Sequence, residues 1–302
     1  MTRTLQNGPR ILGAPVTVDP VLGIDCGGTG TRAVLLQDGR SIARYSEGPM
    51  NALLHADGTE RLAQLIIQTG ATRVGIGLAG LRGAEAALVV QCELEDRTGT
   101  HVVVGDDTQA ALLGAFGGEP GIVVLSGTGN NALGRDAQGT MARAGGYGFL
   151  LGDEGSGYWI AARAIRMALR SHDRTGPQVP AIEDIVLDYY NEDFDAIVRR
   201  VHGAPGNRRI VADLVPPLAA SHDPSVSELF VLAADHLVRL ADAVRRALGP
   251  LRVSMCGGVF QIERVRNRFA AATGGVPPIA TPEVGAARLA LADCHDAQGD
   301  SA

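Results

Sequence analysis

Apolar residues in the first 150 positions of the chain come in short runs separated by glycine-rich turns. Residues 21–25 (VLGID) are an apolar, β-branched run that stops at CGGTGT, and residues 32–37 (RAVLLQ) resume it before Asp38-Gly39. An Asp-Gly pair between two apolar runs is a hairpin signal. The pattern therefore predicts a strand, a glycine turn, a second strand, a tight turn and a third strand.

The same plan recurs about a hundred residues later. An apolar run at 121–125 leads into the turn SGTGN, a strand is expected near 131–134, and a second turn falls at Gln138-Gly139. The pairs Thr29-Gly30 and Thr128-Gly129 are 99 residues apart. Two glycine turns in the same setting suggest a duplicated unit that faces one ligand from two sides.

Strands and helices alternate between and after these two segments. Strands are predicted at 73–80, 101–106 and 252–258, and helices at 83–97, 107–116, 224–248, 259–272 and 282–293. The helix at 224–248 has apolar residues close to a 3.6-residue period, with Pro224 in its first turn and Gly249-Pro250 beyond its end. Residues 171–223 are assigned to loops and short helices. This alternation indicates an α/β fold with some parallel strand pairing.

Length and composition narrow the class of protein. A chain of 302 residues suggests two domains, and a formal net charge of −6 gives no electrostatic reason to bind nucleic acid. The four cysteines are far apart in sequence, so no zinc site is indicated, and no apolar stretch is long enough for a membrane span. We expect a cytoplasmic protein whose residues 1–18 are a loose leader.

None of the 27 basic residues is a lysine, which excludes the Walker-type phosphate loop. In Gly23–Arg32 (GIDCGGTGTR), glycine amides and threonine hydroxyls could bind a polyphosphate without a cationic side chain, and Asp25 could hold Mg²⁺ through waters. Leu125–Asn130 (LSGTGN) offers the same donors. A structural hairpin turn explains either segment alone, but it explains the matched pair poorly. Gly257 and Gly258 in MCGGVFQ could admit an adenine or ribose, or form a packing turn.

Two further segments contain acids. Asp106 and Asp107 end a strand and open a helix, where one acid could cap the helix and the other accept a proton. Gly145–Trp159 (GGYGFLLGDEGSGYW) is too irregular for a helix or strand, and Ser156 could begin the helix that follows. Asp153 in this segment could accept hydrogen bonds from two sugar hydroxyls, or it could help Ser156 to cap that helix.

These five segments, in this order, resemble the BadF/BadG/BcrA/BcrD ATPase family of the sugar kinase, Hsp70 and actin superfamily, and most closely its N-acetylglucosamine kinase branch. GIDCGGTGTR resembles the first phosphate motif, GIVVLSGTGNN the second and MCGGVF the adenosine motif. GGYGFLLGDEGSGYW is similar to a long signature of that branch. The resemblance extends from about residue 21 to about residue 290.

The resemblance implies two RNase H-like domains, as in actin-like ATPases, with the active site in a cleft between them. The expected domains are 19–115 and 116–281, the second with a helical insertion, and the helix near 282–293 would return to the first domain. Closure would bring a sugar hydroxyl in line with the γ-phosphate of ATP. A homodimer is also expected from the resemblance.

The resemblance also implies roles for individual residues. Asp107 matches the catalytic base, and Asp25 the acid near the metal. The implied ATP-binding residues are Gly27, Gly28, Thr29, Gly30, Thr31, Gly127, Thr128, Gly129, Gly257 and Gly258. The implied sugar-binding residues are Asn51, Asn131, Gly145, Gly146, Tyr147 and Asp153. Tyr147 replaces a more usual Trp, Gly30 stands where many relatives carry Lys, and Cys26 beside the phosphates is expected to make activity sensitive to thiol reagents.

The sequence therefore predicts an ATP- and Mg²⁺-dependent kinase that phosphorylates the 6-hydroxyl of N-acetylglucosamine or glucosamine. One alternative is an activator ATPase of the dehydratase or reductase type, which holds an iron–sulfur cluster between subunits. The other is a non-catalytic sugar sensor, although the leader before Val21 is too short for a helix-turn-helix.

Overall fold

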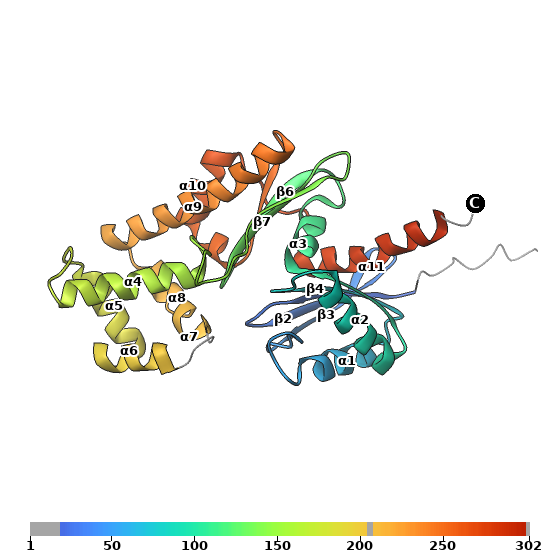
Figure 1. Cartoon of the computed structure of the whole chain (residues 1–302), viewed down its shortest axis with the longest axis horizontal. Coiled ribbons are helices and arrows are strands. Elements are labelled where there is room, and N and C mark those ends of the chain that lie inside the picture. The colour runs from blue at the N-terminus through green and yellow to red at the C-terminus, as the bar shows by residue number, and fades with distance from the viewer. Residues whose placement is uncertain (1–18, 204–207, 300–302) are drawn as a thin grey trace, which may run out of the picture.

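A computed structural model describes residues 19–203 and 208–299 of the chain (Figure 1). The expected leader, residues 1–18, lies outside the described residues. Two sheets and the helices around them make an α/β architecture. No helix in the described part of the chain is long and apolar enough to cross a membrane.

The first sheet has the strand order β3-β2-β1-β4-β5 and is mixed. Its strands are β1 (Val21–Cys26), β2 (Thr31–Gln37), β3 (Arg40–Glu47), β4 (Arg73–Leu78) and β5 (His101–Asp106). The three N-terminal strands are antiparallel, whereas β4 and β5 run parallel to β1. β1 reads as a continuous apolar run because it is central and covered on both faces. The helices α1 (Gly58–Thr69) and α2 (Ala84–Thr98) connect these strands.

The second sheet repeats this arrangement with the order β8-β7-β6-β9. Its strands are β6 (Gly121–Ser126), β7 (Asn130–Arg135), β8 (Met141–Gly145) and β9 (Val253–Cys256). Two antiparallel hairpin pairs are again followed by a parallel strand, since β9 pairs with β6 as β4 pairs with β1. The duplicated strand plan predicted from the sequence is therefore present.

Helices make up most of the chain between β8 and β9. They are α4 (Gly157–His172), α5 (Pro180–Tyr190), α6 (Phe194–Gly203), α7 (Arg208–Ala212), α8 (Val215–Ala220) and α9 (Pro224–Leu248). After β9 come η1 (Gly258–Gln261), α10 (Glu263–Thr273) and α11 (Pro282–Gly299). α9 has the bounds that its sequence period predicts, with Asp223 as its N-cap.

Two helices lie between the sheets, α11 and α3 (Asp107–Phe116), as Figure 1 shows. α11 packs against α3 and against β1, β4 and β5 of the first sheet, so the C-terminal helix contacts the sheet formed by the N-terminal strands. A β-carbon on Gly75 would lie 1.8 Å from the Ala286 carbonyl oxygen, and one on Gly285 would lie 1.8 Å from that of Ala110. The close packing of α11 thus depends on glycines in the sheet and in the helix. The expected domain boundary near residue 115 stays a prediction.

Some elements differ from the sequence expectation. Residues 58–69 form α1, which was not among the expected elements although Leu62, Leu65 and Ile66 make one buried face. The helix expected at 259–272 is instead the short 3₁₀ turn η1 followed by α10. The difference arises because Ile262 is extended, with φ −76° and ψ 111°, and interrupts the helical path.

Candidate functional site

The first glycine turn joins β1 to β2 and is closed by a hydrogen bond of 3.0 Å from the Gly27 amide to the Gly30 carbonyl. Thr29 is exposed at its tip. Within the described chain, the amides of Gly28, Thr29 and Gly30 have no hydrogen-bond partner. Exposed, unpaired amides in a tight turn suit an anion.

Thr31 has a different position from the rest of this turn. Its side chain is buried, and its hydroxyl accepts a hydrogen bond of 3.2 Å from the Met50 amide. The hydroxyl also lies 3.6 Å from the thiol of Cys26. Thr31 therefore ties the turn to the following loop, and its predicted contact with ATP stays a prediction.

The second glycine turn joins β6 to β7 and is closed in the same way, by a hydrogen bond of 2.9 Å from the Gly127 amide to the Gly129 carbonyl. The start of α4 supports it: the Gly157 amide donates to the Gly127 carbonyl at 2.8 Å, and the Tyr158 amide to the Thr128 carbonyl at 3.2 Å. The amides of Thr128 and Gly129 have no partner in the described part of the protein. The two turns thus present similar sets of free donors.

The third glycine segment, Gly257-Gly258, packs against the start of the second glycine turn at Ser126. Gly257 has φ +101°, and a β-carbon there would lie 2.2 Å from the Ser126 carbonyl oxygen. A β-carbon on Gly258 would meet nothing within 4 Å. Gly257 is therefore required for packing against the second turn, while Gly258 leaves open space beside it, as the predicted nucleotide contact needs.

Asp25 ends β1 next to the first turn, and its Oδ2 accepts a hydrogen bond of 2.7 Å from Arg32 on β2. Burial raises the pKa of the Asp25 carboxyl, although the Arg32 partner opposes this. No group of three or more His, Cys, Asp or Glu side chains in the described residues could hold a metal by itself. One carboxylate that completes its ligand shell with phosphate oxygens and waters fits the ligand preference of Mg²⁺.

Asp106 and Asp107 have separate roles. The Asp106 carboxylate caps α3 by accepting the amides of Thr108 and Gln109, both at 2.9 Å, and it also pairs with Arg143. Asp107 takes no part in the cap. Burial, and then the charges of Asp106 and Asp25, raise the pKa of Asp107 to about 7. A carboxylate with this pKa suits a general base near neutral pH.

Three of the residues predicted to bind sugar, Asn131 on β7 and the two glycines at 145–146, lie together. The Thr108 hydroxyl, next to Asp107, donates to Asn131 Oδ1 at 2.8 Å. β-Carbons on Gly145 and Gly146 would lie 3.4 Å and 3.3 Å from atoms of Asn131. The structure therefore brings Asn131, Gly145 and Gly146 together close to Asp107.

Asp153 lies against the second turn. It has φ +65°, and its Oδ2 is buried without a hydrogen-bond partner in the described chain. Arg208 of α7 approaches that oxygen to 3.7 Å, and burial raises the pKa of the carboxyl. Ser156 alone caps α4, by accepting the Trp159 amide at 3.2 Å. The capping alternative for Asp153 is therefore wrong, whereas a buried, strained acceptor is consistent with a ligand contact.

Asn51 and Tyr147 differ from the other predicted sugar residues. Asn51 is fully buried, with its amide nitrogen bonded to the Ala79 carbonyl at 2.8 Å and its oxygen to the Leu53 amide at 2.9 Å. A sugar hydrogen bond would have to compete with these bonds. Tyr147 is 65% exposed. Their sugar-binding roles stay predictions.

The expected thiol sensitivity at Cys26 has no support in the structure. Cys26 is fully buried on β1, and burial raises the pKa of its thiol to about 11. Because the thiolate is the reactive form, such a thiol reacts slowly.

Four arginines contribute charge to this region, and the sequence patterns did not identify them: Arg32, Arg82, Arg143 and Arg208. The β1–β2 register could have indicated Arg32, since it lies opposite Asp25 across the hairpin. Arg82, Arg143 and Arg208 meet their partners only through tertiary packing.

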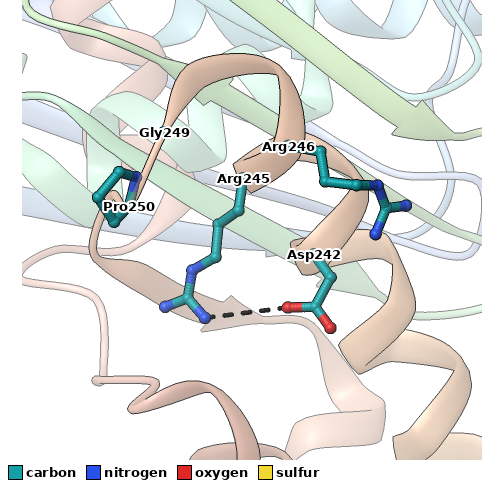
Figure 2. A pocket seen from close by; sticks show the side chains of 5 residues that line it. All are labelled: Asp242, Arg245, Arg246, Gly249 and Pro250. Atoms are coloured by element: carbon teal, nitrogen blue, oxygen red, sulfur yellow. Dashed lines mark ion pairs between the residues drawn. The ribbon is translucent and has the colours of Figure 1, made fainter.

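Two surface hollows in the described residues lie away from the predicted site. One of about 450 Å³ lies at the end of α9 and is lined by Asp242, Arg245, Arg246, Gly249 and Pro250 (Figure 2). Another of about 330 Å³ lies between α5, α6 and α7. Neither is lined by a residue of the glycine turns.

Comparison with known proteins identifies the family to which the chain is similar. The model of the BadF/BadG/BcrA/BcrD ATPase family matches residues 22–290. The N-acetylmuramic acid/N-acetylglucosamine kinase of Clostridium acetobutylicum is 29% identical over 208 residues, covering 64% of this chain and 68% of the relative. Glucosamine kinase GspK of Vibrio cholerae is 30% identical over 192 residues, covering 59% and 63%. The chain thus matches less than two thirds of the latter's length.

Solved structures agree on the fold. A candidate N-acetylglucosamine kinase from Chromobacterium violaceum has a TM-score of 0.74 at 29% identity, covering 90% of this chain and 99% of that one. A ROK family glucokinase from Streptomyces griseus, in complex with glucose and AMPPNP, has a TM-score of 0.60 at 18% identity, covering 90% and 98%. The predicted α/β, actin-like fold class is confirmed.

Proposed function

Because the chain belongs to the BadF/BadG/BcrA/BcrD ATPase family, we propose that it is an ATP-dependent amino-sugar kinase that phosphorylates the 6-hydroxyl of N-acetylglucosamine or glucosamine. The observation that carries the proposal is the position of Asp107. Its carboxylate is free of the helix cap, has a pKa raised to about 7, and lies beside the Thr108–Asn131 hydrogen bond. It is a base placed next to a hydrogen-bonding amide.

The reaction assigns one role to each group of residues. The free amides of the two glycine turns bind the phosphates of ATP, and Asp25 holds the Mg²⁺ that neutralises charge on them. Asn131, Asp153 and the backbone at Gly145-Gly146 orient the sugar. Asp107 accepts the proton of the attacking sugar hydroxyl. The hydroxyl oxygen bonds to the γ-phosphorus, and ADP leaves as the bond from that phosphorus to its bridging oxygen breaks.

The experiment is an ADP-release screen over glucosamine, N-acetylglucosamine, N-acetylmannosamine, N-acetylmuramic acid and glucose. Phosphorus–proton correlation NMR of the product locates the phosphate on the sugar. Turnover with either of the two proposed sugars, together with phosphate on C6 of the product, supports the proposal. Sugar binding without ADP release would favour the sensor alternative, and ADP release without sugar an activator ATPase.

No contact among the described residues favours the activator alternative. The cysteines whose side chains are described, Cys26, Cys92 and Cys256, lie on β1, α2 and β9, and two of them are buried. An intersubunit cluster needs cysteines that reach a surface together. A cytoplasmic location and a homodimer remain part of the proposal, and gel filtration with light scattering tests the latter.

A further inference from the structure

We propose that Arg82 is a positioning residue for the predicted sugar-binding segment at residues 145–148, called the wall below. Arg82 holds this wall in place from the side of the first sheet. The Arg82 guanidinium donates a hydrogen bond of 2.6 Å to the Gly146 carbonyl. Arg82 lies in the loop between β4, a strand of the first sheet, and the helix α2. Gly146 directly follows β8, a strand of the second sheet. The inference rests on the proposed function, because it assigns to this bond an effect on sugar binding.

The wall itself has little that fixes its conformation. Gly145, Gly146 and Gly148 all have φ between +75° and +82°, and glycine loses more conformational freedom on ordering than any other residue. Leu150 and Leu151 that follow are each 81% exposed, so burial contributes little there. The wall therefore depends on its hydrogen bonds.

Both backbone groups of Gly146 are bonded. Its amide donates to the Asn130 carbonyl at 3.0 Å, within the second sheet, and its carbonyl accepts from Arg82. A hydrogen bond from a charged donor is stronger than one between neutral groups. Removing the arginine would leave the carbonyl to water and release the wall on its side facing the first sheet.

The loop that carries Arg82 is anchored next to the first phosphate turn. The Ala79 amide donates to the Cys26 carbonyl at 3.0 Å, and the Ala79 carbonyl accepts from the Asn51 amide nitrogen at 2.8 Å. Gly80 and Gly83, with φ +79° and +84°, flank the arginine. Hydrogen bonds thus connect the first turn, through Ala79 and the Arg82 loop, to the wall at Gly146.

The charge of Arg82 also acts on Asp153, the acidic side chain that is predicted to bind the sugar. Burial raises the pKa of the Asp153 carboxyl, and the charge of Glu154 adds to this, whereas the hydrogen bond from the Asn130 amide and the charges of Arg208 and Arg82 oppose it. Arg82 thus hydrogen-bonds to Gly146 and also contributes positive charge at Asp153.

The test compares Arg82→Ala with the wild type in steady-state kinetics and in calorimetric titration with N-acetylglucosamine or glucosamine. We expect the sugar KM and Kd to rise about 10-fold, as loss of one charge-assisted hydrogen bond implies. The KM for ATP stays within about 2-fold, since the charge-assisted bond is made to the sugar wall. Arg82→Lys keeps a charged donor and restores part of the loss. Arg97→Ala is the matched control, because Arg97 lies on α2 of the same sheet and pairs only with Glu60 and Glu93 in the described residues.

The possible outcomes separate the two proposals. An active wild type with an unchanged sugar KM and Kd in Arg82→Ala overturns the inference alone. An equal rise in the KM for ATP and for sugar, or no rescue by lysine, also overturns it, because a general structural role would give that result. A wild type that releases no ADP with any of the sugars overturns the proposed function and the inference with it.

Discussion

The Thr108 hydroxyl donates a hydrogen bond of 2.8 Å to the side-chain oxygen of Asn131. This bond joins the first turn of α3 to β7 of the second sheet. It occupies one lone pair of the Asn131 side-chain oxygen and so limits rotation of that amide. The predicted base at Asp107 and the predicted sugar contact at Asn131 are therefore held in one arrangement, and a sugar bound by Asn131 lies next to Asp107.

The substitution Asp107→Asn removes the proposed base and keeps the shape of the side chain. We expect turnover to fall about 10²–10⁴-fold, the usual contribution of general base catalysis, while the Kd for ATP changes little. ADP release and calorimetric titration with an ATP analogue measure the two quantities. Near-normal turnover would assign the base to another residue.

The pH dependence of kcat/KM reports the same group. Because the pKa of Asp107 is raised to about 7, a large fraction is protonated and inactive below that pH. We expect kcat/KM to rise about 10-fold per pH unit below pH 7 and to level off above it. Asp106 and Asp25 interact with Asp107, so the midpoint belongs to the cluster. A profile flat from pH 5 to 8 would contradict the assignment.

The substitution Asp106→Ala tests the division of roles between the two acids. It removes the cap of α3 and the partner of Arg143, so we expect a loss of about 1 kcal/mol of unfolding free energy, measured by urea denaturation. Turnover should fall less than in Asp107→Asn. Asp223→Ala is the control, since it removes the cap of α9 and contacts no predicted site residue. The control should leave turnover unchanged.

The substitution Gly285→Ala tests the packing of α3 against α11. Helix propensity alone would favour alanine by about 1 kcal/mol. A β-carbon there would lie 1.8 Å from the Ala110 carbonyl oxygen and 2.4 Å from the Gly114 nitrogen, so the helices must separate. We expect a net loss of about 3 kcal/mol in thermal or urea unfolding. Gly203→Ala in α6 meets nothing within 4 Å and should not destabilise the protein.

Labelling of the native protein with a maleimide tests the burial of the thiols. Of the three cysteines whose side chains the structure describes, Cys92 is exposed and should react first, whereas burial raises the pKa of Cys26 to about 11 and that of Cys256 to about 12. Peptide mass spectrometry identifies the modified sites. We expect activity to survive full modification of Cys92. Rapid labelling of Cys26, with loss of activity, would show that the first turn opens in solution.

Much of the fold could be predicted because local patterns agree with it. The apolar runs at β1 and β6, the glycine turns after them and the 3.6-residue period of α9 each depend on neighbouring residues. α1 was not predicted, although its buried face includes Leu62, Leu65 and Ile66. For η1, a single extended residue, Ile262, decided the break, and such a break leaves little trace in a hydrophobic pattern.

The parts of the candidate site that consist of backbone amides could be predicted from the sequence. Glycine amides follow from the sequence alone, so both turns could be recognised together with Asp25 and the acid pair at 106–107. The sequence could not decide which acid caps α3, because either carboxylate can reach the free amides of the first turn.

The sequence by itself determined the two strand–turn–strand units and the glycine donors, since these are properties of short segments, and the absence of lysine, which is a property of the composition. Only the tertiary structure decided that Asp107 is the acid outside the helix cap, that Asn51 is buried, and that Arg82 reaches Gly146 across 64 residues of chain. A long side chain pairs with a group that lies within its reach in space, whatever their separation in sequence. That distance is set by how α3 and α11 pack between the two sheets, and no local pattern records it.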